Sequence, residues 1–174
     1  GLAQRANKNV SSAVAAFRKA IALNNKNAEY YFALADTLAD SGDSKGAVTI
    51  LENLLRQQPE NWQAHLAIGR IALGEKRYDE AHKRAAEVSK KVPQLTVGLE
   101  LDGETLMAEG KPADAAKVFE KAYKQMPSGG LAQKQALALQ RAGKPNPESP
   151  LLDWLKQHAD DNSARANLAI LYQN

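Results

Sequence analysis

The 174-residue chain contains no cysteine, and histidine occurs only at positions 65, 82 and 158. Without cysteine the chain cannot form disulfide bonds, thiolate metal sites or a cysteine nucleophile. The histidines do not form a His-x3-His pair, the helical spacing that holds a zinc ion. The Gly129-Gly130 pair is not followed by the Gly-Lys-Ser/Thr of a phosphate-binding loop. We therefore predict no metal site, no cofactor and no enzyme activity.

Long apolar runs and a strong excess of one charge are also missing. No segment approaches the about 20 apolar residues of a membrane-spanning helix. The net charge is +3, and the densest basic cluster consists of Lys83, Arg84, Lys90 and Lys91. We interpret this cluster as a solvated helix face. The alternative is that the cluster binds nucleic acid or an acidic polymer. Such binding requires basic residues concentrated on one face, beside aromatic or polar side chains that contact the ligand.

Proline is scarce, with seven residues in the chain, yet three of the prolines recur at a fixed interval. Pro59, Pro93 and Pro127 are 34 residues apart, and alanines at 13, 47, 81 and 115 keep the same interval. Proline lacks an amide donor and restricts the residue before it, so each of these prolines is expected to stop a helix. A fixed period of this length is typical of a repeated helix–turn–helix unit.

The pattern inside each period resembles the tetratricopeptide repeat (TPR) family. In the repeat that begins at residue 28, the large residues Leu34 and Leu51 accompany the small residues Ala35 and Ala47. Small residues let two helices approach closely, and large residues fill the space beside them. Because one hairpin leaves an apolar side uncovered, neighbouring hairpins must stack to bury it.

The repeats that begin at residues 62 and 96 follow this pattern with two departures. His65 stands where an aromatic residue is expected, and Asp102 stands where leucine is expected. Each departure indicates a local shift in packing. Gly42 and Gly110 mark the hairpin turns at equivalent positions, whereas in the middle repeat the glycine comes earlier, at Gly74.

The resemblance implies an all-α fold, namely a right-handed α-solenoid of about ten helices in a single array over residues 1–174. Both ends of the sequence cut through a repeat, so we expect a fragment of a longer solenoid, truncated at both ends. Leu168, Leu171 and Tyr172 would then lack a covering helix, which predicts end-to-end self-association. The expected units are a second helix at 9–25, repeats at 28–61, 62–95, 96–127 and 128–161, and a first helix at 162–174.

A narrower resemblance covers roughly the second half of the chain. The segments GLELDG at 98–103, LDWLKQH at 152–158 and LAILY at 168–172 are similar to the C-terminal part of TPR-repeat lipoproteins of bacterial PEP-CTERM/exosortase systems. In those proteins the tryptophan-leucine helix ends in His-Pro, and here Ala159 replaces the proline. The resemblance implies a periplasmic or envelope protein linked to exopolysaccharide and protein sorting. The absence of cysteine fits the cytoplasm equally well.

In TPR proteins the first helix of each hairpin lines a concave groove, and the resemblance transfers this role to twelve residues. The groove would combine apolar pockets with carboxylates and suit a partner segment that carries an apolar anchor and a Lys or Arg. We interpret the carboxylates at 100 and 104 as solvated groups and not as an acid/base pair. The expected groove residues are Glu29, Phe32, Asp36, Asp40, Gln63, Leu66, Arg70, Leu73, Val97, Glu100, Glu104 and Met107.

The sequence therefore favours a non-catalytic scaffold that binds a protein or peptide partner, with no nucleic acid as ligand. Two alternatives stay open. The array could space envelope components in polysaccharide export without a defined peptide ligand, or it could be a cytoplasmic TPR adaptor.

Overall fold

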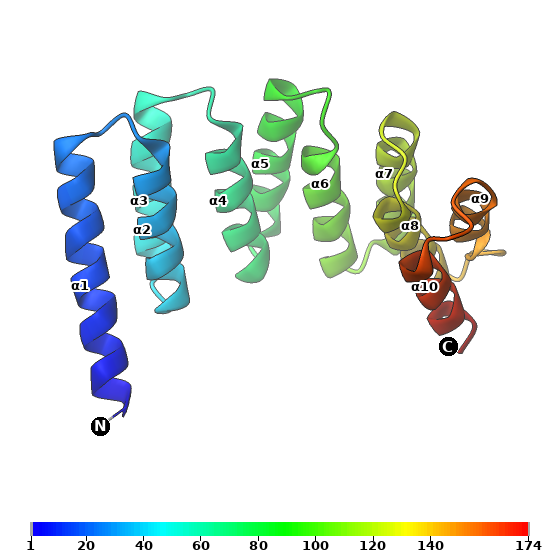
Figure 1. Cartoon of the computed structure of the whole chain (residues 1–174). Helices are drawn as coiled ribbons and strands as arrows, with labels where there is room; N and C mark the ends of the chain where they lie inside the picture. Colours follow the sequence, from blue (N-terminus) through cyan, green and yellow to red (C-terminus); the bar gives the residue numbers. More distant parts are fainter. Residues whose placement is uncertain (1, 174) are drawn as a thin grey trace.

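The computed structural model describes residues 2–173, with side-chain surroundings from residue 9 onward, and all ten elements in that part are α-helices. The helices follow one another in a row, with the two termini at opposite ends (Figure 1). This arrangement confirms the predicted all-α solenoid of about ten helices. The helices are α1 (Leu2–Leu23), α2 (Ala28–Asp40), α3 (Ser44–Gln57), α4 (Trp62–Gly74), α5 (Tyr78–Lys91), α6 (Val97–Ala108), α7 (Pro112–Gln125), α8 (Gly129–Arg141), α9 (Ser149–Gln157) and α10 (Asn162–Gln173).

The first helix differs from its expected span of 9–25. It begins at Leu2 and ends at Leu23, so it is 22 residues long. Residues 2–8 contain neither glycine nor proline, and nothing in that segment stops the helix from extending toward the N-terminus. At the other end, a turn at residues 25–26 precedes Asn27, whose side chain caps α2 by accepting from the Glu29 amide.

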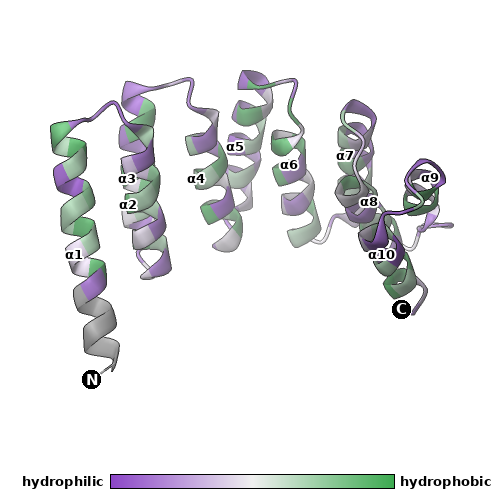
Figure 2. Ribbon diagram, viewed as in Figure 1, coloured by the Kyte–Doolittle hydropathy of each residue, from purple (hydrophilic) through white to green (hydrophobic). Residues whose placement is uncertain are grey.

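The core is formed by the repeat positions that the sequence pattern singles out. Leu34, Ala47, Leu51 and Leu54 are all 0% exposed in the first complete hairpin. Each helix pairs with its neighbours along the row, and hydrophilic and hydrophobic residues alternate around α2 to α8 (Figure 2). No helix in the described part of the chain is long and apolar enough to cross a membrane.

Helix α6 shares the buried small position, Gly103, with α2 and α4, but two of its other buried positions are shifted by one residue. Its buried side chains include Leu101 and Thr105, whereas Asp102 lies at the surface of the helix. Leu101 thus takes the core position one residue before the one expected from the repeat. The Thr105 hydroxyl donates to the Leu101 carbonyl at 2.7 Å, which satisfies this buried polar group. The expected local shift in packing at Asp102 is confirmed.

The C-terminal end of the row is better covered than the sequence suggests. Leu168 and Leu171 pack against a buried cluster that includes Ala136 and Leu151. They are not left uncovered as expected, because α10 contacts both α8 and α9. Tyr172 is 64% exposed. Self-association through this end stays a prediction.

The hairpin turns end their first helix with a left-handed residue at positions 42, 76 and 110. Gly42 has φ +88° and Gly110 has φ +78°, but the middle turn uses Lys76 with φ 58°. In each turn the next residue donates its amide to a carbonyl five residues earlier, at 2.8 to 2.9 Å. The middle turn therefore has a lysine where the turns on either side have a glycine. Gly74 is the last residue of α4, and the 34-residue interval places the turn at Lys76.

Replacement of Lys76 with glycine is expected to raise the free energy of unfolding by about 0.5–1 kcal/mol. A side chain in the left-handed region costs about 1–2 kcal/mol, and the extra freedom of an unfolded glycine offsets part of this gain. Urea denaturation followed by circular dichroism measures the change. The matched control is Gly110→Lys at the equivalent turn, which should lower the free energy of unfolding by a similar amount. A Lys76→Gly protein that is less stable than wild type contradicts the prediction.

Candidate partner-binding groove

The twelve residues predicted to line the groove are called here the groove face, and the structure leaves none of them buried. Helices α2, α4 and α6 supply four each, and Figure 1 shows these helices as the nearer row, with α3, α5 and α7 behind. Helix α4 also contacts α6 directly. The groove face is thus accessible, and its use by a partner stays a prediction.

Helix α2 presents a line of carboxylates on the groove face. Glu29, Asp36 and Asp40 are exposed, and none of them forms an ion pair within the described residues. The spacing of seven and then four residues places the three carboxylates along one side of the helix. Phe32, which lies between them, packs partly against the core and is partly exposed. This side of α2 can offer an apolar contact flanked by negative charge.

The carboxylates of α6 are already paired within the chain. Lys134 of α8 donates to Glu100 Oε2 at 2.6 Å and to Glu104 Oε1 at 2.7 Å. The Thr96 hydroxyl donates to the other oxygen of Glu100 at 2.9 Å. The negative charge of the groove face is therefore concentrated on α2 and not spread evenly along it.

Sequence reasoning missed Lys134. A signal was present, because Lys134 follows Glu100 by 34 residues and so occupies the equivalent position of the next repeat. Burial alone would raise the pKa of Glu100, but the bonds from Lys134 and Thr96 outweigh it and lower the pKa below 4.5. Arg70 of α4 adds to this lowering, so α4 and α6 act electrostatically on the same part of the groove face.

Comparison with known proteins agrees with this architecture. Two family models, both described as tetratricopeptide repeat, match residues 4–59 and 32–89. The fold is that of a TPR solenoid. Such repeats generally act as non-catalytic scaffolds that bind protein or peptide partners. Among curated proteins, no sequence matches the chain significantly.

Three solved structures illustrate the likeness of this TPR array to others. TTC0263, a thermophilic TPR protein in Thermus thermophilus, is 15% identical with a TM-score of 0.72, over 100% of this chain and 96% of that one. MamA 41-end from Desulfovibrio magneticus RS-1 is 17% identical with a TM-score of 0.71, over 92% and 93%. YrrB, described as a TPR protein with an unusual peptide-binding site, is 18% identical with a TM-score of 0.63, over 91% and 82%. Identities this low establish the fold alone.

The basic cluster of the TPR array is not a free cationic surface. Arg84 is only 12% exposed and donates to Glu52 and Glu80, and its Nη1 lies 3.1 Å from His65 Nδ1. Burial and then the Arg84 charge lower the pKa of His65 below 6.5. Lys91 pairs with Glu60 at 3.0 Å. Two of the four cations are therefore neutralised internally, and His65 replaces the expected aromatic residue as a neutral partner of arginine.

The His82 side chain of α5 contacts two carboxylates of the next hairpin, one in α6 and one just after it. Its Nδ1 lies 2.6 Å from Asp102 Oδ1, and its Nε2 lies 3.2 Å from Glu109 Oε2. The ring can donate to both carboxylates only when it is protonated. Burial would lower the pKa of His82, but the hydrogen bonds to Asp102 and Glu109 outweigh it and raise the pKa above 6.5. Sequence reasoning missed this cluster, because its members are 20 and 27 residues apart.

The His82 cluster predicts a pH-dependent stability. Because the folded-state pKa of His82 is raised, its contribution is fully present below pH 6.5 and is lost as the pH rises through the folded value. Wild type should exceed His82→Gln by about 1 kcal/mol at low pH, and the difference should shrink above neutrality. Because the pKa of His65 is lowered, its contribution to the free energy of unfolding changes with pH in the opposite direction. His65 is present in both proteins, so this contribution cancels in the difference between them. Urea denaturation at pH 5.5, 7 and 8.5 tests this, and a pH-independent difference rules it out.

The segment around Trp154 holds the last hairpin together. The rings of Trp154 and His158 are stacked 3.5 Å apart, and Tyr123 of α7 meets Trp154 edge-on at 6.5 Å. Trp154 Nε1 donates to Asp161 Oδ2 at 2.8 Å, and the other oxygen of Asp161 accepts from the Ala164 amide. The motif of the narrower resemblance thus links α7, α9 and the start of α10, which is a structural role.

Proposed function

We propose that this protein is a non-catalytic scaffold that binds a segment of a partner protein on the groove face. The observation that carries the proposal is the side of α2, where Glu29, Asp36 and Asp40 are unpaired within the described residues and Phe32 lies among them. A partner with an apolar anchor and neighbouring Lys or Arg side chains suits this surface in polarity and charge.

The distribution of charge also indicates which part of the groove face a basic partner prefers. Lys134 binds both Glu100 and Glu104 and offsets one of their two negative charges, so a basic partner gains less on α6 than on α2. On α2 the carboxylates are exposed and give up no existing ion pair when a cation approaches. Leu66 and Leu73 of α4 are partly exposed and add apolar side chains to the groove face. The partner segment therefore lies over α2 and α4.

The basic hexapeptide KKLFKK, labelled with fluorescein, tests this binding by fluorescence anisotropy. The Asp36→Asn/Asp40→Asn variant should bind it about tenfold more weakly, because two charge contacts of up to about 1 kcal/mol each are lost. The matched control is Asp79→Asn/Asp160→Asn, which makes the same charge change at exposed acids outside the groove face. Equal weakening in both variants, or binding unaffected by Phe32→Ala with Leu66→Ala, counts against the groove.

We also propose a location in the cell for this scaffold. The resemblance of the second half of the chain supports a periplasmic or envelope protein of an exopolysaccharide and PEP-CTERM protein-sorting system. The matched families and structures do not bear on this point. Fractionation of the source cells and deletion of the gene test it. A protein found only in the cytosolic fraction, or unchanged surface polymer and unchanged sorting after deletion, removes the envelope role and leaves a cytoplasmic TPR adaptor.

A further inference from the structure

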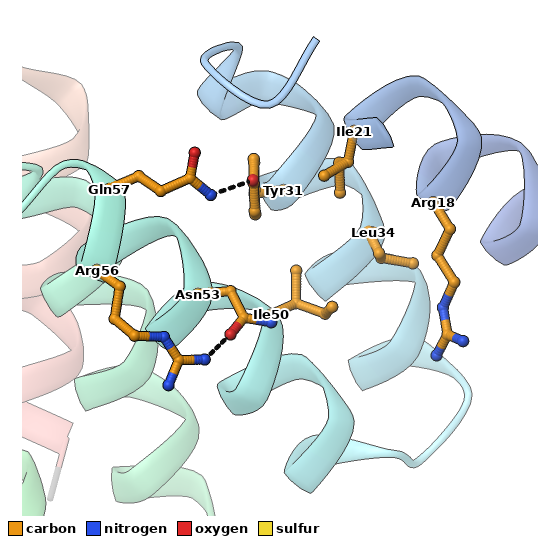
Figure 3. A pocket seen from close by; sticks show the side chains of 8 residues that line it. All are labelled: Arg18, Ile21, Tyr31, Leu34, Ile50, Asn53, Arg56 and Gln57. Carbon is orange, nitrogen blue, oxygen red and sulfur yellow. Dashed lines mark hydrogen bonds between the residues drawn. The ribbon is translucent and has the colours of Figure 1, made fainter. Parts of the chain in front are cut away.

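A second candidate surface lies between α1 and α3, the second helices of consecutive hairpins. The structure has a pocket of about 310 Å³ there, near the lower end of the about 300–1,000 Å³ typical of ligand sites. Helix α2 contributes Tyr31 and Leu34 to it, and these residues are not part of the groove face. The pocket is therefore a separate surface (Figure 3).

The floor of the pocket is apolar. Ile21 of α1 and Ile50 of α3 line it together with the fully buried Leu34 of α2, so an apolar side chain that enters it exchanges water for contacts with the two isoleucines. On one wall, Gln57 Nε2 donates to the Tyr31 hydroxyl at 2.6 Å (Figure 3). An apolar group that contacts the isoleucines can leave this hydrogen bond in place.

The rim of the pocket is cationic, and no carboxylate lines it among the residues that the structure describes. Arg18 of α1 and Arg56 of α3 are exposed and lie on opposite sides (Figure 3). Arg56 donates to the neutral amide of Asn53, and Arg18 has no ion pair within the described residues. Glu52 and Glu60, the two acids four residues from Arg56 in sequence, are bound by Arg84 and Lys91 instead.

The sequence around α1 reinforces this charge. The first 28 residues contain no Asp or Glu, and their five cations are Arg5, Lys8, Arg18, Lys19 and Lys26. This end of the chain therefore attracts acidic partners, whereas the exposed side of α2 attracts basic ones. The two surfaces select ligands of opposite charge.

We propose that the α1/α3 pocket binds an acidic peptide segment in which one apolar side chain is flanked by carboxylates. The apolar side chain contacts the partly exposed Ile21 and Ile50 on the floor of the pocket. The flanking carboxylates accept hydrogen bonds from Arg18 and Arg56, whose planar guanidinium groups match a carboxylate in a two-point contact. The scaffold thereby has two docking sites, and one partner can occupy each.

The test uses a fluorescein-labelled acidic hexapeptide, EELFEE, beside the basic hexapeptide KKLFKK, since the two share the same apolar pair. Anisotropy titrations should show that EELFEE binds wild type and that Arg18→Glu/Arg56→Glu weakens this binding tenfold or more. The same variant should leave KKLFKK binding no weaker than in wild type. Asp36→Asn/Asp40→Asn should have the converse effect, so failure of the pocket is distinguishable from failure of the groove face.

The matched control is Lys19→Glu/Lys45→Glu, which reverses two exposed cations on the same helices outside the pocket. EELFEE binding that falls equally in this control and in the pocket variant overturns the proposal, because long-range charge then explains the effect. Absence of EELFEE binding also overturns it. So does binding of wild type to phosphatidylglycerol vesicles without binding of the peptide, which reassigns the surface to a lipid. Circular dichroism verifies that each variant is folded.

Discussion

Replacement of Phe119 by alanine is expected to lower the free energy of unfolding by about 3–5 kcal/mol. The Phe119 side chain is 1% exposed and is the largest fully buried side chain of the described core. It packs with Ala115, Ala122 and Leu131, so its removal leaves a cavity between α7 and its neighbours. Because stacked hairpins depend on each other's contacts, the loss at α7 uncouples the repeats on either side of it.

Guanidinium denaturation followed by circular dichroism measures this effect. The control is Leu137→Ala, which removes an apolar side chain that is 38% exposed and should cost much less than the core substitution. A Phe119→Ala protein within about 1 kcal/mol of wild type contradicts the prediction, since core Phe→Ala changes cost several times that amount. A separate early transition in the variant is consistent with unfolding of the array in parts.

Gly98→Ala has the second largest expected effect. It should lower the free energy of unfolding by about 1–3 kcal/mol. A Cβ placed on Gly98 lies 2.7 Å from the Ser89 amide nitrogen and 2.8 Å from the Ala85 carbonyl oxygen. These are backbone atoms of α5, so they cannot rotate away as a side chain can. Helix α6 must therefore shift away from α5, and the His82–Asp102 contact between these helices weakens with it.

A matched glycine separates this steric effect from helix propensity. A Cβ at Gly74, which is also helical, meets no atom within 4 Å. Gly74→Ala should therefore raise the free energy of unfolding by up to about 1 kcal/mol. Thermal and chemical denaturation of both variants measure the two changes in the free energy of unfolding. If Gly98→Ala proves as stable as Gly74→Ala, then α5 and α6 do not approach as closely as the structure indicates.

The fold was largely predictable because the repeat positions are local and periodic. Leu34, Ala47 and Phe119 are buried at positions read from the 34-residue interval, and the all-helical solenoid follows from them. The conformation of one residue that departs from the repeat was not predicted. Lys76 is left-handed at the position that Gly42 and Gly110 occupy in the repeats on either side, and the repeat pattern alone gave no sign of it.

The candidate site was only partly predictable. The groove face was identified by family position, and the structure leaves its residues accessible. Its charge distribution was not predictable from one helix at a time, because Lys134 reaches Glu100 and Glu104 from another helix. The sequence likewise marked Arg84 as part of a basic face, whereas the structure commits its charge to Glu52 and Glu80.

The sequence by itself determined that this chain is a stack of helical hairpins, because small and large residues at a constant interval decide which sides of the helices meet. Only the tertiary structure decided which charges are left for a partner. Ion pairs such as Glu52–Arg84 and Glu100–Lys134 join residues 32 and 34 positions apart. Such pairs form only when neighbouring repeats stack. The charges that stacking leaves available for binding are the unpaired acids of α2 and the arginines of the α1/α3 pocket, Arg18 and Arg56.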